Sequence, residues 1–372
     1  MLASRQAAAI TGASHARSRG AGSRRACRAM AAAGGFQGCA APLPRPIKVV
    51  GCGSICLDYL ASVAAYPRPD QKMRTETLET QGGGNCANAL TAAARLGLSP
   101  TIVTKIGDDG LGDGMLSELG AEGVDTSLVL RAEGCPSPFT YIIVDRAGGT
   151  RTCIHTPGAP MGPGEMAPAL VDAALAGAAL VYSDGRLTEA ALLLARAARR
   201  RGVPVLVEGE RLRPGLEDLL AEADYVVTSA HFPQEWTGEA TIGDAMVALA
   251  QRLPRARAIV TTRGTRGSVL LRRAGAGEQP AAAAATATPE APLVAQVVVA
   301  PAAGLDKALV VDTTGAGDSF IGSMIYGIVT GLPWERTLAL GSVVAACKCT
   351  ALGARQGLPR RPQLRAGMLG AE

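Results

Sequence analysis

The residues best suited to do chemistry lie in one glycine-rich segment, Val310-Val311-Asp312-Thr313-Thr314-Gly315-Ala316-Gly317-Asp318-Ser319-Phe320. We predict a strand at Ala308–Val311, then a tight glycine turn, then a helix with one apolar face. The first N–H groups of a helix lack partners within it and lie at the positive end of its dipole. The segment therefore predicts a binding site for an anion, such as a phosphoryl group in transfer.

Asp318 lies at the mouth of this predicted anion site. A carboxylate there can accept the proton of a substrate hydroxyl that attacks phosphorus, and phosphoryl transfer otherwise needs mainly positioning and charge neutralisation. The alternative is that Asp318 only stabilises the first turn of the helix, an effect of about 0.3–1 kcal/mol. The residue types alone leave both interpretations open.

A second glycine-rich segment, Gln81-Gly82-Gly83-Gly84-Asn85-Cys86-Ala87-Asn88, leads into a predicted helix at Ala87–Leu96. Its glycines permit close approach of the backbone to a ligand, and the two asparagine side chains can hydrogen-bond hydroxyl groups. The alternative for Asn85 is a purely structural cap at the start of the helix.

Two more segments follow predicted strands. The run Gly51-Cys52-Gly53-Ser54-Ile55-Cys56-Leu57-Asp58 is similar to a dinucleotide-binding fingerprint, but cysteine replaces the third glycine, so this interpretation is not favoured. Asp58 can either bind a ligand or cap a turn. In Thr262-Arg263-Gly264-Thr265-Arg266-Gly267, the glycines would let the chain pass close to a ligand.

The elements that must position these segments alternate between strand and helix. Between residues 179 and 262 the pattern is strand–helix with short connections, which is typical of a mainly parallel sheet covered on both faces. Phe139–Asp145 and Thr150–Thr156 alternate as two strands of a hairpin. We therefore expect one doubly wound α/β domain with a small lid built from this hairpin and nearby strands.

Charge is concentrated at the N-terminus. The chain has 372 residues and a net charge of +5, yet residues 1–50 contain no Asp or Glu and several Arg, so the remainder is close to neutral and gives no sign of nucleic-acid binding. Residues 1–43 have the Ala-, Arg- and Ser-rich composition of an organelle transit peptide, chloroplast more than mitochondrion. The alternative is a tail without an import signal, or translation from Met30, in a cytoplasmic protein.

Other features narrow the function further. The nine cysteines are scattered along the chain, which favours reduced thiols over disulfides. Neither they nor the three histidines have the spacing of zinc ligands. No apolar stretch reaches the ~20 residues of a membrane span. Residues 274–292 are a low-complexity insertion rich in Ala and Pro, with no expected function.

The whole string from Asp312 to Phe320 resembles the C-terminal signature of the ribokinase-like carbohydrate kinases, the pfkB family. The resemblance spans about residues 46 to 362. It implies a ribokinase-like fold over residues 44–362, with lid strands within about 58–80 and 136–158 and a C-terminal tail at 363–372. It also implies that Asp318 is the catalytic base and that Gly315, Ala316 and Gly317 form the anion hole.

The same resemblance assigns the other segments. It implies that the sugar is bound by Asp58, Gly82, Gly83, Asn85 and Asn88. It implies that ATP lies beside Thr262, Gly264, Gly267 and Gly353. In family members that bind potassium, the start of the signature supplies oxygen ligands, which would here be Asp312 and Thr314.

The chain departs from the family at one motif. After the predicted strand Tyr225–Ser229 the family commonly has Asn-x-x-Glu, which is tied to Mg²⁺ and phosphate, but this chain continues Ala230-His231-Phe232. Ketohexokinases also lack that motif, and Asp184-Gly185-Arg186 with Val207-Glu208-Gly209-Glu210-Arg211 resembles their spacing. The placement of Mg²⁺ is therefore in doubt.

From these residues we expect ATP- and Mg²⁺-dependent phosphorylation of a sugar hydroxymethyl group. One alternative is a nucleoside kinase of the same fold, which the few aromatic residues disfavour. Another is a non-catalytic regulatory protein, which the intact Asp318 and glycine turn disfavour. No GxxxxGK[ST] string supports a P-loop kinase. Partners are expected to be sugar and ATP, with a second copy of the chain at the lid, and neither nucleic acid nor membrane.

Overall fold

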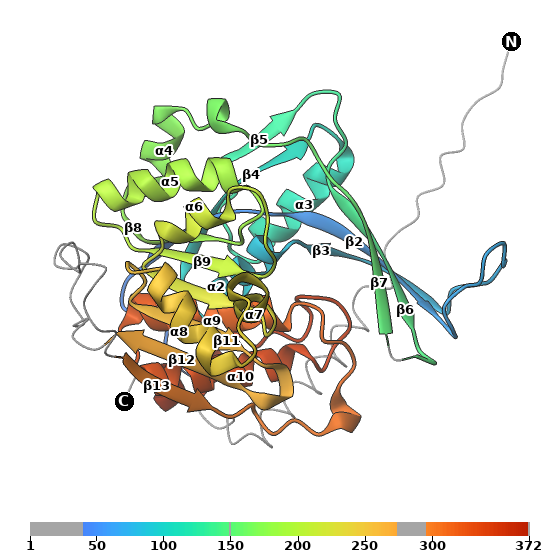
Figure 1. Ribbon diagram of the computed structural model, residues 1–372. Helices are drawn as coiled ribbons and strands as arrows, with labels where there is room; N and C mark the ends of the chain where they lie inside the picture. Colours follow the sequence, from blue (N-terminus) through green and yellow to red (C-terminus); the bar gives the residue numbers. More distant parts are fainter. Residues whose placement is uncertain (1–39, 149, 274–294, 371–372) are drawn as a thin grey trace, which may run out of the picture.

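The structure is a computed structural model that describes residues 40–148, 150–273 and 295–370 (Figure 1). The predicted leader, 1–43, lies outside these ranges up to residue 39, and the predicted insertion, 274–292, lies outside them entirely. In the part of the chain described, no helix is long and apolar enough to cross a membrane.

Within the described ranges, nine strands form one large sheet in the order β13-β12-β11-β10-β9-β8-β1-β4-β5. All neighbouring pairs are parallel except β11–β12 and β12–β13. The strands are β1 (Lys48–Cys52), β4 (Ser99–Gly107), β5 (Val129–Ala132), β8 (Ala178–Ser183), β9 (Val205–Gly209), β10 (Tyr225–Thr228), β11 (Ala258–Thr262), β12 (Ser268–Arg273) and β13 (Ala295–Ala300). The order reverses between β1 and β8, and ligands of such sheets bind beyond the carboxyl ends of strands at this switch point.

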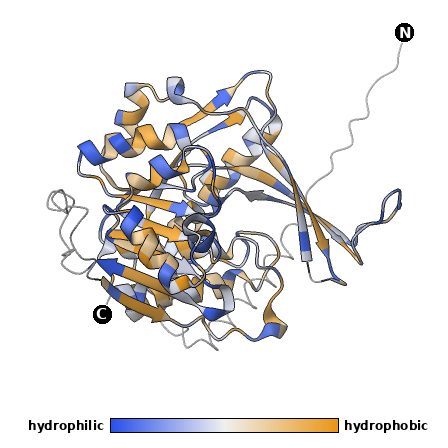
Figure 2. Cartoon of the chain, viewed as in Figure 1, coloured by the Kyte–Doolittle hydropathy of each residue, from blue (hydrophilic) through white to orange (hydrophobic). Residues whose placement is uncertain are grey.

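Helices cover both faces of the sheet, so that each face has its own apolar core. One face carries α2 (Asn85–Arg95), α3 (Gly110–Ala121), α9 (Ala316–Thr330) and α10 (Trp334–Lys348). The other carries α4 (Pro168–Leu175), α5 (Thr188–Arg200), α6 (Leu216–Ala221), α7 (Phe232–Thr237) and α8 (Ile242–Arg252). Because both faces are buried, the central strands are apolar along their length (Figure 2). The predicted doubly wound, mainly parallel sheet is confirmed.

A second, smaller sheet projects from the body, on the right in Figure 1. In the described residues it has the order β3-β2-β6-β7, from β2 (Cys56–Val63), β3 (Thr77–Gly83), β6 (Phe139–Asp145) and β7 (Thr150–Thr156). The β2–β6 pair is parallel and the other two are antiparallel. The hairpin β6–β7 has the predicted bounds, and we call this sheet the lid.

The predicted strand at Ala308–Val311 is wrong. Residues Lys307–Leu309 form a 3-10 turn, in which the Asp306 carboxylate accepts a hydrogen bond from the Ala308 N–H at 3.0 Å. The next two residues, Val310 and Val311, are extended but each 41% exposed. Among the described residues they pair with no strand, and the N–H groups of Val311 and Asp312 both donate to the carbonyl of Cys349.

The residues expected to form a C-terminal tail pack against the body as far as they are described. Leu364 and Leu369 are buried, and the Tyr326 hydroxyl donates to the Leu369 carbonyl at 3.1 Å. The buried Arg361 ties the same region to α2 by donating to the Leu96 carbonyl. These contacts hold the C-terminal end of the chain beside α9.

Candidate active site

The site is organised by the N-terminus of α9. Gly315 caps the helix with a φ of +75°, a left-handed conformation that glycine adopts without strain. A side chain at Gly315 would also place its Cβ 2.8 Å from the Cβ and carbonyl oxygen of Ala354. At Gly317, by contrast, the position of a Cβ has no atom within 4 Å. The first turn of the helix is therefore fixed on one side and open on the other, as an anion site requires.

Asp318 lies in this first turn and is 8% exposed. Its Oδ2 accepts a hydrogen bond of 2.8 Å from Nδ2 of Asn88 in α2. The two helices can approach closely because Gly322 has no side chain; a Cβ there would lie 2.6 Å from the Ala89 carbonyl. Two of the predicted site residues, 230 positions apart in the chain, are thus in direct contact.

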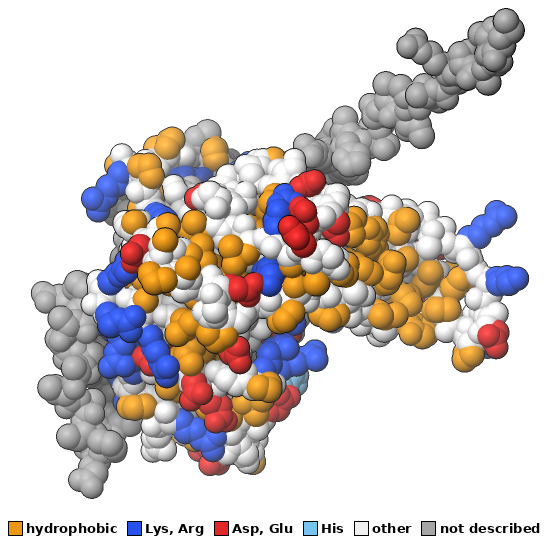
Figure 3. Space-filling view, turned by 90° about the horizontal axis from the view of Figure 1, so that it is seen from above, with side chains coloured by type: hydrophobic (Ala, Val, Ile, Leu, Met, Phe, Trp, Pro, Cys, Tyr) orange, Lys and Arg blue, Asp and Glu red, His pale blue; other side chains and the backbone are white. Residues whose placement is uncertain are grey.

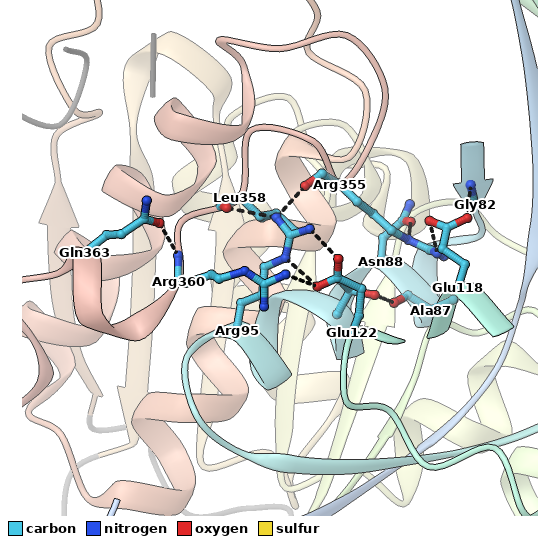
Figure 4. A network of polar contacts seen from close by, with 11 residues as sticks. Gly82, Ala87, Asn88, Arg95, Glu118, Glu122, Arg355, Leu358, Arg360 and Gln363 are labelled. Carbon is cyan, nitrogen blue, oxygen red and sulfur yellow. Dashed lines mark hydrogen bonds and ion pairs between the residues drawn. The ribbon is translucent and has the colours of Figure 1, made fainter. Parts of the chain in front are cut away.

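Arg355 connects Asn88 to the glycine-rich loop that precedes α2, and Figure 4 shows it near Asn88, Glu118 and Gly82. Its Nε donates to Oδ1 of Asn88 at 2.9 Å, which fixes the orientation of the carboxamide. Its terminal nitrogens donate to the Gly83 carbonyl at 2.9 Å and to Oε1 of Glu118 at 3.1 Å. The neighbouring Gly82 N–H donates to the other oxygen of Glu118 at 2.9 Å. A buried arginine therefore holds the glycine loop against Asn88, which in turn contacts Asp318.

Asp58 joins the same group from strand β2. Its carboxylate lies against Gly83, where a Cβ would be only 2.2 Å from Oδ2, so any side chain there would displace it. The Cys56 thiol donates to Oδ1 at 3.2 Å, and burial raises the pKa of Asp58. Asn85 is the first residue of α2 and is half-buried, while Gly84 is the N-cap. The alternative interpretation of Asn85 as the helix cap is wrong.

Burial also raises the pKa of Asp318, to about 7. The hydrogen bond from Asn88 opposes this shift, while the negative charges of Glu210 and Asp184 add to it. A base whose pKa is close to the working pH is free of its proton often enough to act, yet basic enough to accept another. A carboxylate with a pKa in this range can act as a general base at neutral pH.

Two further carboxylates lie where β8 and β9 end, at the switch point of the sheet. Asp184 accepts hydrogen bonds from the Ser54 N–H at 2.8 Å and the Cys86 N–H at 3.1 Å, which fixes the turn after β1 against the start of α2. Burial, with the charge of Asp318 next, raises the pKa of Glu208 well above its usual range. The Tyr182 hydroxyl donates to Glu208 at 3.0 Å.

The predicted nucleotide-side residues fall into two places. Thr262, Gly264 and Gly267 lie at the turn between β11 and β12, where the Thr262 hydroxyl donates to the Thr228 carbonyl at 3.2 Å. Gly267 is required there by packing, since a Cβ would lie 2.0 Å from the Ala300 carbonyl oxygen. Gly264 has open space around it. Gly353 lies instead beside the signature, with its N–H donating to Oδ2 of Asp312 at 2.8 Å.

The expected potassium ligands are already engaged within the protein. Oδ1 of Asp312 accepts from the N–H and the hydroxyl of Thr314, at 2.9 and 2.7 Å. The ammonium group of Lys348 donates to the carbonyl oxygen of Asp312 at 2.6 Å. An added cation at this carbonyl would lie beside a positive charge. These residues therefore do not fit a monovalent metal ion.

In the described ranges no three His, Cys, Asp or Glu side chains are grouped to hold a metal ion. Glu210, directly after β9, pairs with Arg186 at 2.8 Å and with Arg213 at 2.9 Å.

Three residues of this arrangement were missed from the sequence. Arg355 lies two residues after Gly353, which was expected on the nucleotide side, but its guanidinium reaches the glycine-rich loop at Gly83. Asp184 was noted only for its spacing, and its place directly after the apolar strand β8 could have marked it as a site residue. Lys348 could have been found as a lysine within an apolar helix end, Val343-Val344-Ala345-Ala346-Cys347-Lys348.

Comparison with known proteins shows the family of the chain. The model of the pfkB family carbohydrate kinases matches residues 47–361. The chain belongs to the pfkB family. Ribokinase of Bacillus subtilis is 23% identical over 312 residues, covering 84% of this chain and 96% of the relative. Mouse ketohexokinase is 24% identical over 310 residues, covering 81% and 96%. The bifunctional ribokinase/ribose-5-phosphate isomerase A of Fructilactobacillus sanfranciscensis is 27% identical; the match covers 84% of this chain and only 55% of that longer protein.

Solved structures of the family share the fold. A ribokinase from Agrobacterium tumefaciens, described as putative, matches with a TM-score of 0.70 and 26% identity, covering 87% of this chain and 98% of its own. Arabidopsis thaliana ribokinase, complexed with ribose and ATP, has a TM-score of 0.68 and 23% identity, covering 88% and 100%. A Burkholderia thailandensis nucleoside kinase in complex with inosine has a TM-score of 0.64 and 19% identity, covering 87% and 98%. The ribokinase-like architecture with its lid is thereby established.

Proposed function

We propose that this protein transfers the γ-phosphoryl group of MgATP to a hydroxymethyl group of a sugar. The observation that carries the proposal is the placement of Asp318 in the open first turn of α9, within 2.8 Å of Asn88 from the sugar-binding segment. That one contact joins a candidate base, an anion site and a hydroxyl-binding loop. The relatives that are kinases, and the ribokinase structure bound to ribose and ATP, support the same assignment.

In the proposed reaction Asp58 and Asn85 bind sugar hydroxyls and direct the hydroxymethyl group toward Asp318. Asp318 accepts its proton as the oxygen forms a bond to the γ-phosphorus and the bond to the ADP oxygen breaks. The free N–H groups at the start of α9 then face the charge on the transferring group. Arg355 and Asn88 position the base without touching the reacting atoms.

The lid is proposed to close over the bound sugar and exclude water, which would otherwise accept the phosphoryl group. One described contact already connects it to the catalytic segment: Arg151 of β7 donates to the Thr313 hydroxyl at 2.9 Å. Its guanidinium also lies 3.8 Å from Oδ1 of Asp312. Lid position and the start of the anion site are therefore coupled by charge.

A sugar is favoured over a nucleoside by the two faces of the lid. Asp58, Cys56 and Thr140 lie on the same face of the lid. The Cys56 side chain contacts both Asp58 and Thr140. Tyr59, Phe139 and Tyr141 pack together with ring centroids 5.2–6.0 Å apart. Because successive strand residues point to opposite faces, this aromatic cluster is on the far side of the lid from Asp58. It is not placed to stack on a base held at Asp58.

The outer face of the lid is apolar enough to bind a second copy of the chain. Leu78, Tyr141 and Ile154 are 63%, 51% and 52% exposed, and apolar side chains gather over the lid in Figure 3. Exposed patches of this kind usually mark interaction sites. We propose a homodimer through this face, for which the molecular mass in solution is the direct check.

The cellular location is also a proposal. We propose that residues 1–43 direct import into an organelle, chloroplast more than mitochondrion, on the basis of their composition alone. A fluorescent protein fused after residue 43 should then be imported, and a fusion lacking these residues should stay in the cytoplasm.

The proposed function is tested by measuring ADP formation from MgATP with a panel of free sugars and nucleosides. We expect at least one sugar bearing a free hydroxymethyl group to raise ADP formation far above the rate without acceptor. Turnover with nucleosides alone would replace the sugar by a nucleoside as acceptor. ATP binding with no turnover on any acceptor would favour a non-catalytic protein.

The acid–base assignment predicts a pH profile. The base must be deprotonated, so kcat/KM should fall as the pH drops below about 7, the pKa given by burial of Asp318. Asn88→Ala removes a hydrogen bond that favours the charged carboxylate, so its acidic limb should move to higher pH. In the control Asn85→Ala the limb should stay in place, whatever happens to KM. An unmoved limb in Asn88→Ala would contradict the contact.

A further inference from the structure

Lys348 is the last residue of α10, and its side chain is completely buried. Its ammonium group is surrounded by oxygen atoms of the catalytic segment and the following loop. It donates to the Asp312 carbonyl at 2.6 Å and to the Ala351 carbonyl at 3.4 Å, and it lies 4.0 Å from Oδ2 of Asp312. A buried charge is costly unless such groups compensate it, so this position is a built cation site with a lysine in it.

The surroundings of this ammonium group control the anion hole. Asp312 holds Thr314 through Oδ1 and the Gly353 N–H through Oδ2. Gly315 follows Thr314, and Ala354 follows Gly353. These two residues are in contact, so closely that Gly315 cannot carry a side chain. The ammonium group of Lys348 therefore holds the segment at Asp312 and the loop at Ala351 together. The contact between these two segments determines the position of the first turn of α9.

A metal ion at the same oxygens would be repelled. Bound calcium lies about 2.3–2.6 Å from its oxygen ligands, and Nζ of Lys348 already lies 2.6 Å from the Asp312 carbonyl. The guanidinium of Arg151 is a second positive group, 3.8 Å from Oδ1 of Asp312. One carboxylate thus already faces two cationic side chains.

We propose that the ammonium group of Lys348 takes the place of a monovalent metal ion, so that this protein needs no potassium. As a statement about activity the proposal rests on the proposed kinase function. As a statement about the structure it stands alone, because the cation that holds Asp312 to the 351–353 loop is part of the chain. Both statements can be measured.

The first experiment uses the unmodified protein in Tris buffer with the Tris salt of ATP. Kinase rates are compared in KCl, NaCl and choline chloride at equal ionic strength. The three rates should agree within about twofold, and the thermal unfolding temperature should be the same in KCl and choline chloride. A rate or an unfolding temperature that rises strongly and saturably with KCl alone would overturn the proposal.

The second experiment opens the site with Lys348→Ala, which removes the ammonium group and leaves space for an ion. In choline chloride this variant should lose at least about tenfold in kcat/KM and unfold at a lower temperature, and KCl or NH₄Cl should restore part of both. Lys348→Met is the matched control, because its side chain fills the space without a charge, and salts should restore nothing. A Lys348→Ala protein that responds equally to KCl and choline chloride, or that is unfolded in both, would overturn the proposal.

Failure of the two proposals can be told apart. If no acceptor is phosphorylated in any salt, the proposed function fails, while the unfolding temperatures of the unmodified protein and Lys348→Ala still decide the role of Lys348. If turnover is found and depends on potassium in the unmodified protein, only the inference about Lys348 fails.

Discussion

Replacing Asp318 by asparagine should lower kcat by about 10²–10⁴-fold, the usual contribution of a general base, while the Kd for MgATP stays nearly unchanged. The two side chains have the same shape, so the hydrogen bond from Asn88 can persist through the remaining carbonyl oxygen. What is lost is the ability to accept a proton from the sugar. The measurements are steady-state kinetics on the accepted sugar and calorimetric titration with MgATP.

The fold should not suffer from this change. Burial raises the pKa of Asp318 to about 7, above its value in the unfolded chain, so the charged carboxylate is disfavoured in the folded protein. As the pH rises from the unfolded-state pKa of aspartate to about 7, the free energy of unfolding therefore falls. Asparagine carries no charge and does not cause this loss. At pH 8 the Asp318→Asn protein should therefore unfold at the same or a higher temperature. Asp306→Asn, a change at an exposed aspartate that caps a 3-10 turn, is the control and should retain full turnover. Near-normal turnover in Asp318→Asn would remove the proposed base.

The second large effect is expected at Gly315. Alanine there must adopt a φ near +75°, which costs about 1–2 kcal/mol for an L-residue, and its Cβ would lie 2.8 Å from the Ala354 carbonyl oxygen. The backbone must shift, and with it the N–H groups of the anion site. Because misplacement of reacting groups by about 1 Å can cost roughly 10²-fold, kcat/KM should fall by about one to two orders of magnitude.

Gly331 provides a matched control at the other end of the same helix. It also has a positive φ, +69°, but a Cβ there would meet no atom within 4 Å. Gly331→Ala should therefore lower the free energy of unfolding by a similar amount, about 1–2 kcal/mol, and leave kcat/KM nearly unchanged. Chemical denaturation and steady-state kinetics on both variants check this. Equal activity in the two variants would show that the Gly315 turn does not shape the site.

The parts of the fold that the sequence predicted well are those that local pattern determines. The hairpin β6–β7 alternates regularly, and its bounds are the predicted ones. The strands between β8 and β11 are short apolar runs separated by amphipathic helices, which only a covered parallel sheet explains. The prediction of a strand at Ala308–Val311 was wrong. Valine favours strands, but in the described residues no other strand pairs with this segment, and the residue types of one segment do not show whether a partner strand exists.

The site shows the same division. The segment around Asp318 is continuous in sequence, so residue types and spacing could assign its chemistry. The contacts of Arg355 with Asn88 and Gly83 span more than 260 positions, and nothing local signals them. Asn88 was expected to bind sugar, yet its side chain is engaged with Asp318 and Arg355. Gly267 resembles a nucleotide-side glycine, yet the backbone at Ala300 is enough to require it.

A crystal structure with the accepted sugar and a non-hydrolysable ATP analogue would show directly whether Asp318 acts on the sugar hydroxyl. We expect a sugar hydroxymethyl oxygen within about 2.6–3.2 Å of the Asp318 carboxylate, with the γ-phosphate at the N–H groups that begin α9. A sugar and a nucleotide both bound, but with the γ-phosphate away from that helix terminus, would contradict it.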